Sequence, residues 1–337
     1  MLVLGIETSC DETACAIVKD GKEALSNVIE SQAELHRPFG GVFPEIACRK
    51  HVDVIIPVIQ EALSKAGVSK EQIGLIAVTQ GPGLIGALLI GLNSAKALSL
   101  AWDIPFVGVN HVEAHLYAAM MRESAIPFPA LGLVISGGHT LLLKMSDPCT
   151  YERIGSTQDD AIGEAFDKVA SLLGLPYPGG PAIEQLAKKG RPGRFQFQSG
   201  KVKGRPFDFS FSGLKTNVRY VIKGMNAAKD APLLIQEEEK ADVALSFQET
   251  ALKDIVCKSL AAASAFDCRS LICGGGVANN QRLKELFELH NNADLPLFFP
   301  HPALTTDNAA MIAGLGFHIF AKMGRSSLCL EPFTALN

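Results

Sequence analysis

Apolar runs and polar, glycine-rich turns alternate along the whole chain. Short apolar runs at residues 3–6, 14–18, 75–79 and 106–109 are typical of buried strands, and longer periodic stretches between them predict helices. The polar turn GIETSCDET, residues 5–13, joins the first two strands. Because strands and helices follow one another in this order, we expect a largely parallel sheet that is covered by helices.

The same order of elements recurs in the second half. A strand, a Gly/Ser turn and a strand occupy residues 131–144, and a strand, a glycine-rich turn and a helix occupy residues 270–290. Asp-Ile-Pro-Phe at 103–106 follows the helix of the first half, and Asp-Leu-Pro-Leu at 294–297 follows that of the second. These correspondences predict an internal duplication, with two lobes of one type facing each other across a cleft.

Composition narrows the class of protein. The 337 residues predict two domains, and 47% hydrophobic with 20% charged residues excludes disordered and fibrous classes. A net charge of -4 argues against a protein that coats nucleic acid with its whole surface, but it allows a local basic patch. The most apolar stretch, residues 84–92, is broken by Asn93 and Lys96, so we expect no membrane span.

The first residues run directly into an apolar strand, so we expect no signal peptide, and the eight cysteines form no CxxC pair. Scattered cysteines in apolar surroundings favour reduced thiols rather than a disulfide framework or a zinc site. We therefore expect a cytoplasmic protein.

Two histidines, His111 and His115, stand one helical turn apart and can share a metal ion. Glu113 lies about 200° around the helix from His111, so the segment does not reproduce the HExxH pattern of metallopeptidases. Asp307 is the expected third ligand, because it opens the last helix where the His pair opens the matching helix of the first half. Two histidines and a carboxylate favour iron or a similar divalent ion. The alternative is a pair of histidines on a helix surface.

Glycine-rich turns are candidate sites for a phosphate or nucleotide. The turn SGGHT at residues 136–140 exposes backbone N–H groups that can approach an anion, and Asn280 after the GGG turn can contact a nucleotide. Asp11 and Glu12 in the first turn suit metal, water or proton handling. None of these turns has Walker or Rossmann spacing, and tight turns without a ligand are common.

Two charged stretches are ambiguous. An acidic face that includes Asp160 and Asp167 is expected on a helix within residues 157–175, either as a ligand site or as a solvated face. Residues 188–205 hold seven basic and no acidic side chains, with two phenylalanines between them. This stretch predicts either a contact with a nucleic-acid backbone or a solvated loop.

The ordered set of motifs resembles the TsaD (YgjD/Gcp) family, the bacterial-type tRNA threonylcarbamoyladenosine synthase subunits. The resemblance covers essentially the whole chain. The motifs are GIETSCDET, GPGLIGALLIG, HVEAH, SGGHT, GEAFDKVASLLGLPYPGGP, FDFSFSGLKT, GGGVANN and TDNAAMIA. The family resemblance implies an α/β fold with two RNase H-like lobes of the actin/Hsp70/sugar-kinase (ASKHA) architecture around a central nucleotide cleft. The N-terminal lobe is expected at residues 1–110 plus about 315–337, and the C-terminal lobe at residues 111–314 with the basic loop 188–205.

The resemblance implies transfer of the threonylcarbamoyl group from threonylcarbamoyl-adenylate to N6 of adenosine 37, in tRNAs that read codons beginning with A. AMP is released. It also implies a divalent metal, most often iron, with Zn²⁺ or Mg²⁺ as alternatives, on His111, His115 and Asp307. The ligand-binding positions expected are Val134, Ile135, Ser136, Gly137, Gly138, His139, Asp167, Gly180, Gly275, Gly276 and Asn280. Val134 and His139 stand where archaeal and eukaryotic relatives carry Tyr and Asn, which places this chain on the bacterial or organellar branch.

In the mechanism that we expect, the metal polarises the threonylcarbamoyl group and the 136–139 turn stabilises the leaving phosphate. Asp11 or Glu12 would accept the proton of the adenine amine. Lys201, Lys203 and Arg205 are the expected tRNA contacts. The family further implies a TsaB-like paralogue and a TsaE-like ATPase as partners, or a homodimer as in mitochondrial relatives. The alternatives are a metal-dependent glycoprotein endopeptidase, a small-molecule kinase of the same fold, and a non-catalytic nucleotide switch.

Overall fold

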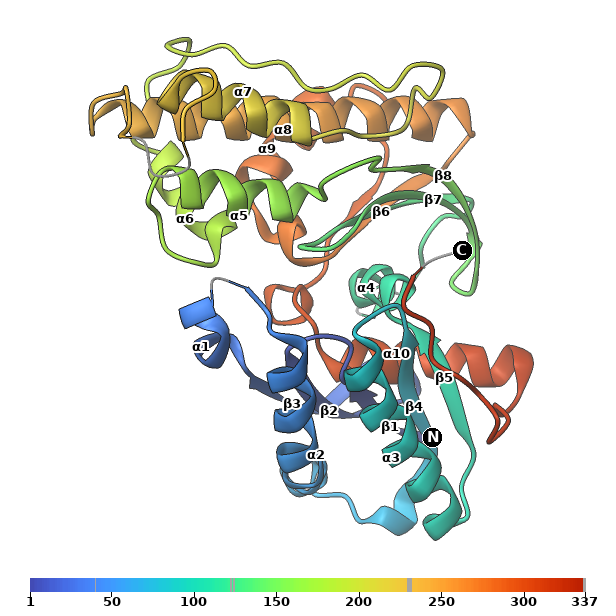
Figure 1. Ribbon diagram of the computed structural model, residues 1–337. Helices are drawn as coiled ribbons and strands as arrows, with labels where there is room; N and C mark the ends of the chain where they lie inside the picture. The colour runs from blue at the N-terminus through green and yellow to red at the C-terminus, as the bar shows by residue number, and fades with distance from the viewer. Residues whose placement is uncertain (40, 122, 124, 229–231, 336–337) are drawn as a thin grey trace. The chain divides into compact units, whose positions relative to one another are not determined.

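The computed structural model describes residues 1–39, 41–121, 123, 125–228 and 232–335 (Figure 1). Residues 40, 122, 124, 229–231, 336 and 337 belong to the two expected lobes and lie outside the described residues. Contacts divide the chain into two units. Unit 1 comprises Met1–Ile126, Pro148–Thr150 and Pro300–Asn337, and unit 2 comprises Pro127–Asp147 and Tyr151–Phe299.

The elements of unit 1 come from both ends of the chain. They are β1 (Leu2–Glu7), β2 (Glu12–Lys19), β3 (Glu23–Ser31), α1 (Ala33–His36), α2 (Pro44–Ala66), β4 (Ile73–Gly81), α3 (Ile85–Trp102), β5 (Phe106–Asn110), α4 (His111–Met120) and α10 (Ala309–Met323). Short 3-10 helices lie at Arg37–Phe39, Lys70–Gln72 and Pro302–Leu304.

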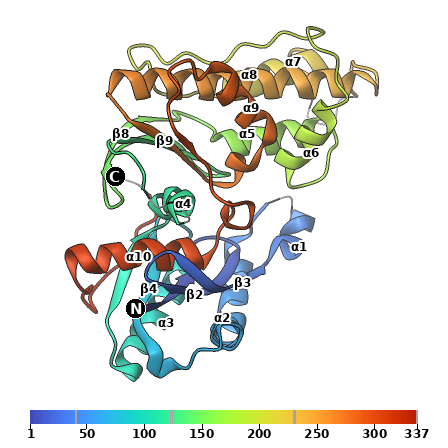
Figure 2. The same cartoon turned by 180° about the vertical axis from the view of Figure 1, so that it is seen from behind.

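A five-stranded sheet with the order β3-β2-β1-β4-β5 forms the centre of unit 1. β1 pairs antiparallel with β2 and parallel with β4, so the sheet is mixed rather than largely parallel. Helices α2 and α3 cover one face, where Leu4 and Ile6 join the apolar core. Helix α10 covers the other face and packs against α4 (Figures 1 and 2). This alternation follows from the two-residue period of a strand.

Gly5 lets α10 approach the middle of β1. A Cβ atom at this position would lie 2.3 Å from the Ala309 carbonyl oxygen and 2.9 Å from the Ala313 Cβ. The helix and the strand are therefore in backbone contact, at a place two residues after Asp307 and two residues before Glu7.

Helix α3 is long and apolar enough to cross a membrane by length and composition, with a mean hydropathy of 1.4. In unit 1 its Ala87, Leu88 and Leu92 are buried, and the helix packs against β4, β5 and α2. These contacts are those of a helix in a packed α/β layer.

Unit 2 repeats this plan. Its elements are β6 (Ala130–Ile135), β7 (Thr140–Asp147), β8 (Thr150–Ser156), α5 (Ile162–Leu172), α6 (Gly179–Ala187), α7 (Ser212–Lys223), α8 (Glu239–Ala265), β9 (Ser270–Gly274), a 3-10 turn (Gly276–Asn279), α9 (Gln281–His290) and β10 (Leu297–Phe298). The sheet order β10-β9-β6-β7-β8 matches that of unit 1 read from its other edge. β6 is antiparallel to β7 and parallel to β9, as β1 is to β2 and β4. The expected duplication is confirmed at the level of topology.

The lobe boundaries expected from the sequence differ from these units. Helix α4 and residues 300–314 were expected in the C-terminal lobe, but they belong to unit 1. The reason is packing: all ten residues of α4 are buried, and the helix packs against α10, which itself covers the sheet of unit 1.

Candidate functional site

Asparagine caps fix the start of both helices that position the candidate metal ligands. The side-chain oxygen of Asn110 accepts a hydrogen bond from the Val112 N–H (2.9 Å), so α4 begins at His111 directly after β5. Asn308 caps α10 by accepting a hydrogen bond from the Met311 N–H (3.0 Å). The caps thereby fix the places of His111 and of Asp307, which precedes its cap by one residue.

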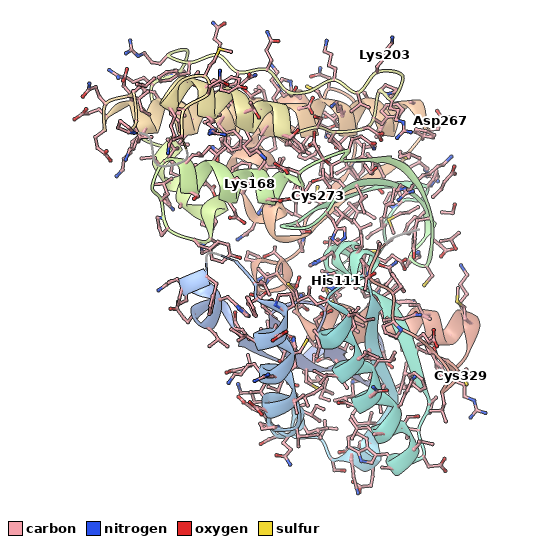
Figure 3. The ribbon with its side chains drawn as sticks, viewed as in Figure 1. His111, Lys168, Lys203, Asp267, Cys273 and Cys329 are labelled. Atoms are coloured by element: carbon pink, nitrogen blue, oxygen red, sulfur yellow. The ribbon has the colours of Figure 1, made fainter. Side chains whose placement is uncertain are left out.

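The structure brings His111, His115 and Asp307 together in unit 1, and Figure 3 labels His111 in this cluster. His115 Nε2 lies 3.2 Å from His111 Nε2 and 3.2 Å from Asp307 Oδ1. His111 Nε2 lies 3.5 Å from the same oxygen. Both histidines are buried, whereas 23% of the Asp307 side chain is exposed, so the cluster is reached from the carboxylate side.

The protonation pattern of the cluster suits a cation. His111 Nδ1 lies 3.0 Å from Glu7 Oε2, which accepts a hydrogen bond from Nδ1 and leaves Nε2 turned towards the other two ligands. His115 Nδ1 is buried and has no hydrogen-bond partner among the described residues. Burial alone would lower the pKa of His111, but the charges of Glu7 and Asp307 outweigh it and raise the pKa to about 9. The cluster thus stabilises a positive charge, and two imidazoles with one carboxylate fit a divalent ion.

Glu7 is a functional residue that the sequence reasoning missed. It is fully buried at the end of β1, where the Ser9 N–H and the Thr79 hydroxyl donate hydrogen bonds to its carboxylate, besides His111. Burial raises the pKa of Glu7, but the positive charge and hydrogen bond of His111 bring it below its usual value. Such a carboxylate orients a metal-binding histidine. The available signal was a lone acidic residue that ends an otherwise apolar strand.

Asp11 ends the β1–β2 turn of the same unit, and Glu12 is the first residue of β2. The Ser31 hydroxyl donates a hydrogen bond to Glu12 (3.3 Å). Burial, followed by the negative charges of Asp307 and Asp11, raises the pKa of Glu12 to about 9. The raised pKa favours the protonated form of Glu12, and Asp11 is the other candidate base in this segment.

Three glycine-containing segments of unit 2 meet at the β6–β7 turn. A Cβ atom on Gly163, in the first turn of α5, would lie 2.6 Å from the Ser136 carbonyl oxygen. One on Gly275 would lie 2.4 Å from the Ile135 carbonyl oxygen, and Gly275 has a φ of +92° that favours glycine. At Gly137 a Cβ would meet nothing within 4 Å. The turn therefore offers accessible backbone beside the N-terminus of α5, as an anion-binding turn does.

The other expected residues of this turn have more restricted roles. Val134 and Ile135 are fully buried, so neither residue exposes surface to a ligand in this structure. The backbone N–H of His139 donates to Ser136 Oγ (3.1 Å), which closes the turn. Gly276 is open, because an added Cβ would meet nothing within 4 Å.

Asp167 holds the N-terminus of α6. Its Oδ1 accepts a hydrogen bond from the Gly179 N–H (2.7 Å), and a Cβ on Gly179 would lie 2.6 Å from the Asp167 Cα. Gly180 has open space, so a ligand can lie against its backbone. The acidic face expected within residues 157–175 is not merely exposed to solvent. Asp160 forms ion pairs with Lys168 (2.7 Å) and Lys215 (2.5 Å).

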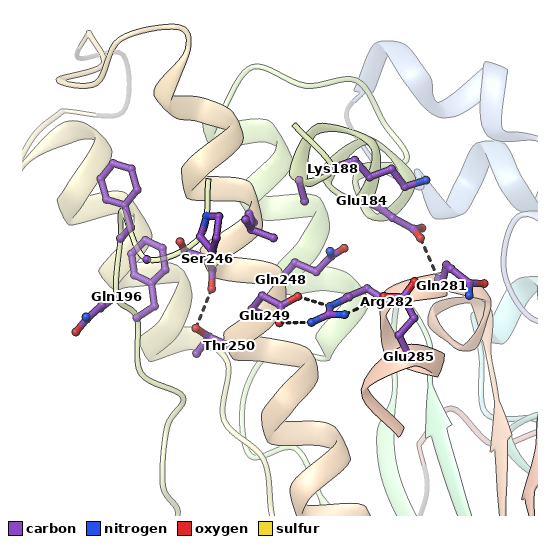
Figure 4. Close-up of a pocket in the computed structure, with 16 residues that line it drawn as sticks. Glu184, Lys188, Gln196, Ser246, Gln248, Glu249, Thr250, Gln281, Arg282 and Glu285 are labelled. Carbon is purple, nitrogen blue, oxygen red and sulfur yellow. Dashed lines mark hydrogen bonds and ion pairs between the residues drawn. The ribbon is translucent and has the colours of Figure 1, made fainter. Parts of the chain in front are cut away.

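Asn280 is hydrogen-bonded to Gln248, a residue that lines an open pocket of about 670 Å³ (Figure 4 shows the pocket and Gln248). Its Oδ1 caps α9 by accepting from the Leu283 N–H (3.1 Å), and its Nδ2 donates to Gln248 Oε1 (3.2 Å). Gln248 and Glu184 both line the pocket. Glu184, which also accepts from the Gln281 N–H (2.9 Å), is one helical turn after Gly180, and that spacing was an unused sequence signal.

The basic loop carries less free positive charge than its sequence indicates. Arg191 pairs with the buried Asp242 (2.8 Å), and Arg205 lies 3.5 Å from Asp208. Lys201 and Lys203 are exposed and have no ion pair or hydrogen bond within the described part of the chain. Lys203 projects away from the helices of unit 2 (Figure 3).

Glu113 yields a pH prediction, because its carboxyl is buried without a side-chain partner among the described residues. Burial raises its pKa to about 8. Because the pKa of Glu113 is higher in the folded protein, its protonated carboxyl contributes fully to stability below 4.5, the pKa in the unfolded chain. This contribution is lost as the pH rises towards 8. At about pH 8, Glu113→Gln should therefore exceed the wild type in unfolding free energy by on the order of 3 kcal/mol.

Denaturant unfolding at several pH values checks this prediction, and the two stability curves should converge near the lower pH. Glu34→Gln, at a position with 78% of its side chain exposed, serves as the control and should change little. Parallel curves for Glu113→Gln and the wild type would show that the carboxylate has a compensating partner.

The fold and the duplicated sheets define the chain as a protein of the ASKHA class, and solved structures agree. The HypF structure from T. kodakarensis aligns with a TM-score of 0.61 at 16% identity, covering 94% of this chain and 47% of that one. The ROK hexokinase of Thermus thermophilus aligns with a TM-score of 0.51 at 15% identity, covering 96% of this chain and 99% of that one. At these identities the likeness shows the fold alone. The expected fold class is confirmed.

Sequence comparison is more specific. The family model "TsaD: tRNA N6-adenosine threonylcarbamoyltransferase" matches residues 23–314. The tRNA N6-adenosine threonylcarbamoyltransferase of Protochlamydia amoebophila (strain UWE25) is 58% identical over 99% of this chain and 97% of its own length. The chain belongs to the TsaD family. It is a transferase that modifies tRNA, and the expected family is confirmed.

Proposed function

We propose that this chain transfers the threonylcarbamoyl group from threonylcarbamoyl-adenylate to N6 of adenosine 37 in tRNAs that read codons beginning with A, and that AMP leaves. The observation that carries the proposal is 58% identity to a tRNA N6-adenosine threonylcarbamoyltransferase over nearly the full length of both chains. The endopeptidase alternative has no support in the site, because the carboxylate nearest the histidines in sequence, Glu113, is buried within α4. Nothing in the comparisons favours the kinase alternative.

The proposed metal ligands are His111, His115 and Asp307, for Fe²⁺ or, as alternatives, Zn²⁺ or Mg²⁺. The support is the convergence of three ligand atoms within 4.8 Å of one another, and the carboxylate of Glu7 behind His111. A bound divalent ion supplies Lewis-acid polarisation of an oxygen of the threonylcarbamoyl group.

The remaining roles belong to the chain's own residues. We propose that the backbone N–H groups of Gly137 and Gly138 hold the phosphate of the donor and stabilise it as it leaves, because those of Ser136 and His139 donate hydrogen bonds within the turn. We propose that Asp167, Gly180 and Asn280 contact the nucleoside. Gln248, the hydrogen-bond partner of Asn280, lines an open pocket that is available to the base. Asp11 accepts the proton that the adenine amine loses when it attacks the carbamoyl carbon.

Reconstitution tests the function directly. The purified chain, with Fe²⁺ and with or without partner proteins, is incubated with threonylcarbamoyl-adenylate and an A-decoding tRNA, and the nucleosides are analysed by mass spectrometry. We expect threonylcarbamoyladenosine and one equivalent of AMP. Cleavage of a protein substrate, or phosphotransfer from ATP without tRNA, in place of this product would support one of the alternatives.

A TsaB-like paralogue and a TsaE-like ATPase are proposed as partners. Supporting this, α2 exposes Val52 (61%) and Ile56 (49%), and the adjoining α3 exposes Ile85 (50%) and Leu89 (41%). Apolar side chains at this spacing on neighbouring helices suit packing against helices of another subunit. A homodimer through the same face is the competing arrangement. No disulfide joins the eight cysteines, all of which lie in the described part of the chain, and this fits the proposed cytoplasmic location.

We propose that Lys201 and Lys203 of the basic loop, for which the described residues offer no ion pair, contact the tRNA. Exchanging both Lys201 and Lys203 for glutamine should weaken tRNA binding and reduce the slope of log affinity against log salt by about one to two units. Donor binding should not change. Lys70→Gln, at an exposed position in unit 1, is the control, and an unchanged slope for the double variant would locate the tRNA surface elsewhere.

A further inference from the structure

A buried histidine of α2 spans the turn that carries Asp11. His51 is fully buried. Its Nε2 lies 3.0 Å from the carbonyl oxygen of Cys10, and its Nδ1 lies 2.7 Å from the hydroxyl of Thr13. The ring therefore contacts the backbone just before Asp11 and the side chain just after Glu12.

The protonation state of this ring follows from its partners. A carbonyl oxygen can only accept a hydrogen bond, so Nε2 carries the proton and donates a hydrogen bond to the Cys10 carbonyl. Nδ1 then has a lone pair, and the Thr13 hydroxyl donates to it. Burial lowers the pKa of His51, which keeps the ring in the neutral form that this pattern requires. Both ring nitrogens are thus fully used within the protein.

The neighbouring carbonyl groups of the turn are held in the same way by other elements. The Leu84 N–H, at the start of α3, donates to the Ser9 carbonyl (2.8 Å). The Gln32 N–H, after β3, donates to the Asp11 carbonyl (3.0 Å). Three consecutive carbonyl groups therefore receive hydrogen bonds from three different elements, and that of Cys10 receives its bond from the side chain of His51.

We infer that His51 is a positioning residue for the reaction: by bridging Cys10 and Thr13, it holds the Asp11–Glu12 carboxyl pair in place beside the metal cluster. In this assignment His51 touches no reacting atom. The inference rests on the proposed function of Asp11. An acid–base group must be held within a fraction of an ångström of its proton, so release of the turn slows the chemical step while leaving binding intact.

The test uses graded variants of both partners in the full-length protein. His51→Leu loses both hydrogen bonds and should lower kcat by about 30-fold, with the KM for the donor and the metal content within about twofold of wild type. Thr13→Val loses one bond and should lower kcat by about tenfold, whereas Thr13→Ser keeps the hydroxyl and should retain most of the wild-type rate. A parallel rise in KM or loss of metal in His51→Leu would instead show general damage to unit 1.

Combining variants distinguishes positioning from plain stability. If His51 acts through Asp11, His51→Leu should cause little further loss of kcat in an Asp11→Asn background. Fully multiplicative losses in the double variant would overturn the inference.

A readout without turnover separates this inference from the proposed function. Hydrogen exchange at the backbone amides of residues 10–13 should become at least about tenfold faster in His51→Leu, while the amides of β4 keep their protection. Unchanged exchange in the turn would overturn the positioning role, whether or not the wild type transfers threonylcarbamoyl groups. Failure of the wild type in reconstitution, with faster exchange in the variant, would reject only the proposed function.

Discussion

Replacing Asp307 by asparagine is expected to remove tight metal binding and to slow threonylcarbamoyl transfer by about a thousand-fold. Asparagine has nearly the same shape, so the cap of α10 by Asn308 is retained. The change removes the negative charge that lies within 3.5 Å of both histidine Nε2 atoms. The imidazole lone pairs then converge without an anion to complete the site.

Metal content per chain after anaerobic loading with Fe²⁺, measured by mass spectrometry, checks the first part, and single-turnover transfer checks the second. Asp294→Asn is a matched control at an exposed turn of unit 2, where the φ of 49° suits asparagine equally well. Metal content equal to that of the wild type in Asp307→Asn would reject the cluster as the metal site.

Replacing Gly5 by alanine is expected to destabilise unit 1 by about 3 kcal/mol and to reduce metal affinity together with stability. The new methyl group would lie 2.3 Å from the Ala309 carbonyl oxygen, so β1 and α10 must move apart. β1 ends at Glu7, and α10 begins just after Asp307. Separating β1 from α10 therefore moves the carboxylate of Glu7, which contacts His111, away from Asp307.

Thermal unfolding with separate probes for the two units measures this loss, since two units need not unfold in one transition. Gly213→Ala is the control, because a Cβ at this helical position would meet nothing within 4 Å. It should be neutral or stabilising by up to about 1 kcal/mol. If Gly5→Ala unfolds at the wild-type temperature, the contact between β1 and α10 is softer than the distances indicate.

Much of the fold could be predicted because it rests on short-range periodicity. The strands β1, β2, β4 and β5, and their counterparts in unit 2, are short apolar runs. The edge strand β3 was not predicted, because few of its residues are buried and it has no apolar run. The boundary between the two lobes was predicted wrongly for a different reason. Helix α4 belongs to unit 1 because it contacts α10, which lies almost 200 residues later in the chain. Local sequence patterns do not show such contacts.

The candidate site shows the same division. The spacing of His111 and His115 predicted a shared ligand, and the internal repeat pointed to Asp307, which the structure places against both. Glu7 and His51 were not found, since their roles depend on partners brought in by tertiary packing. The count of basic residues overestimated the free positive charge of the basic loop, because the sequence does not show that Asp242 pairs with Arg191.

Unit 1 is assembled from segments at opposite ends of the chain, and this imposes an order on its synthesis. When the ribosome has completed β1 to β5 and α4, one face of the sheet still lacks its cover, and Asp307, the proposed third metal ligand, has not been made. Both arrive only with α10, after all of unit 2. If the proposed metal site is correct, metal binding requires that translation has reached α10, and an interrupted nascent chain exposes an apolar surface that quality-control factors can recognise.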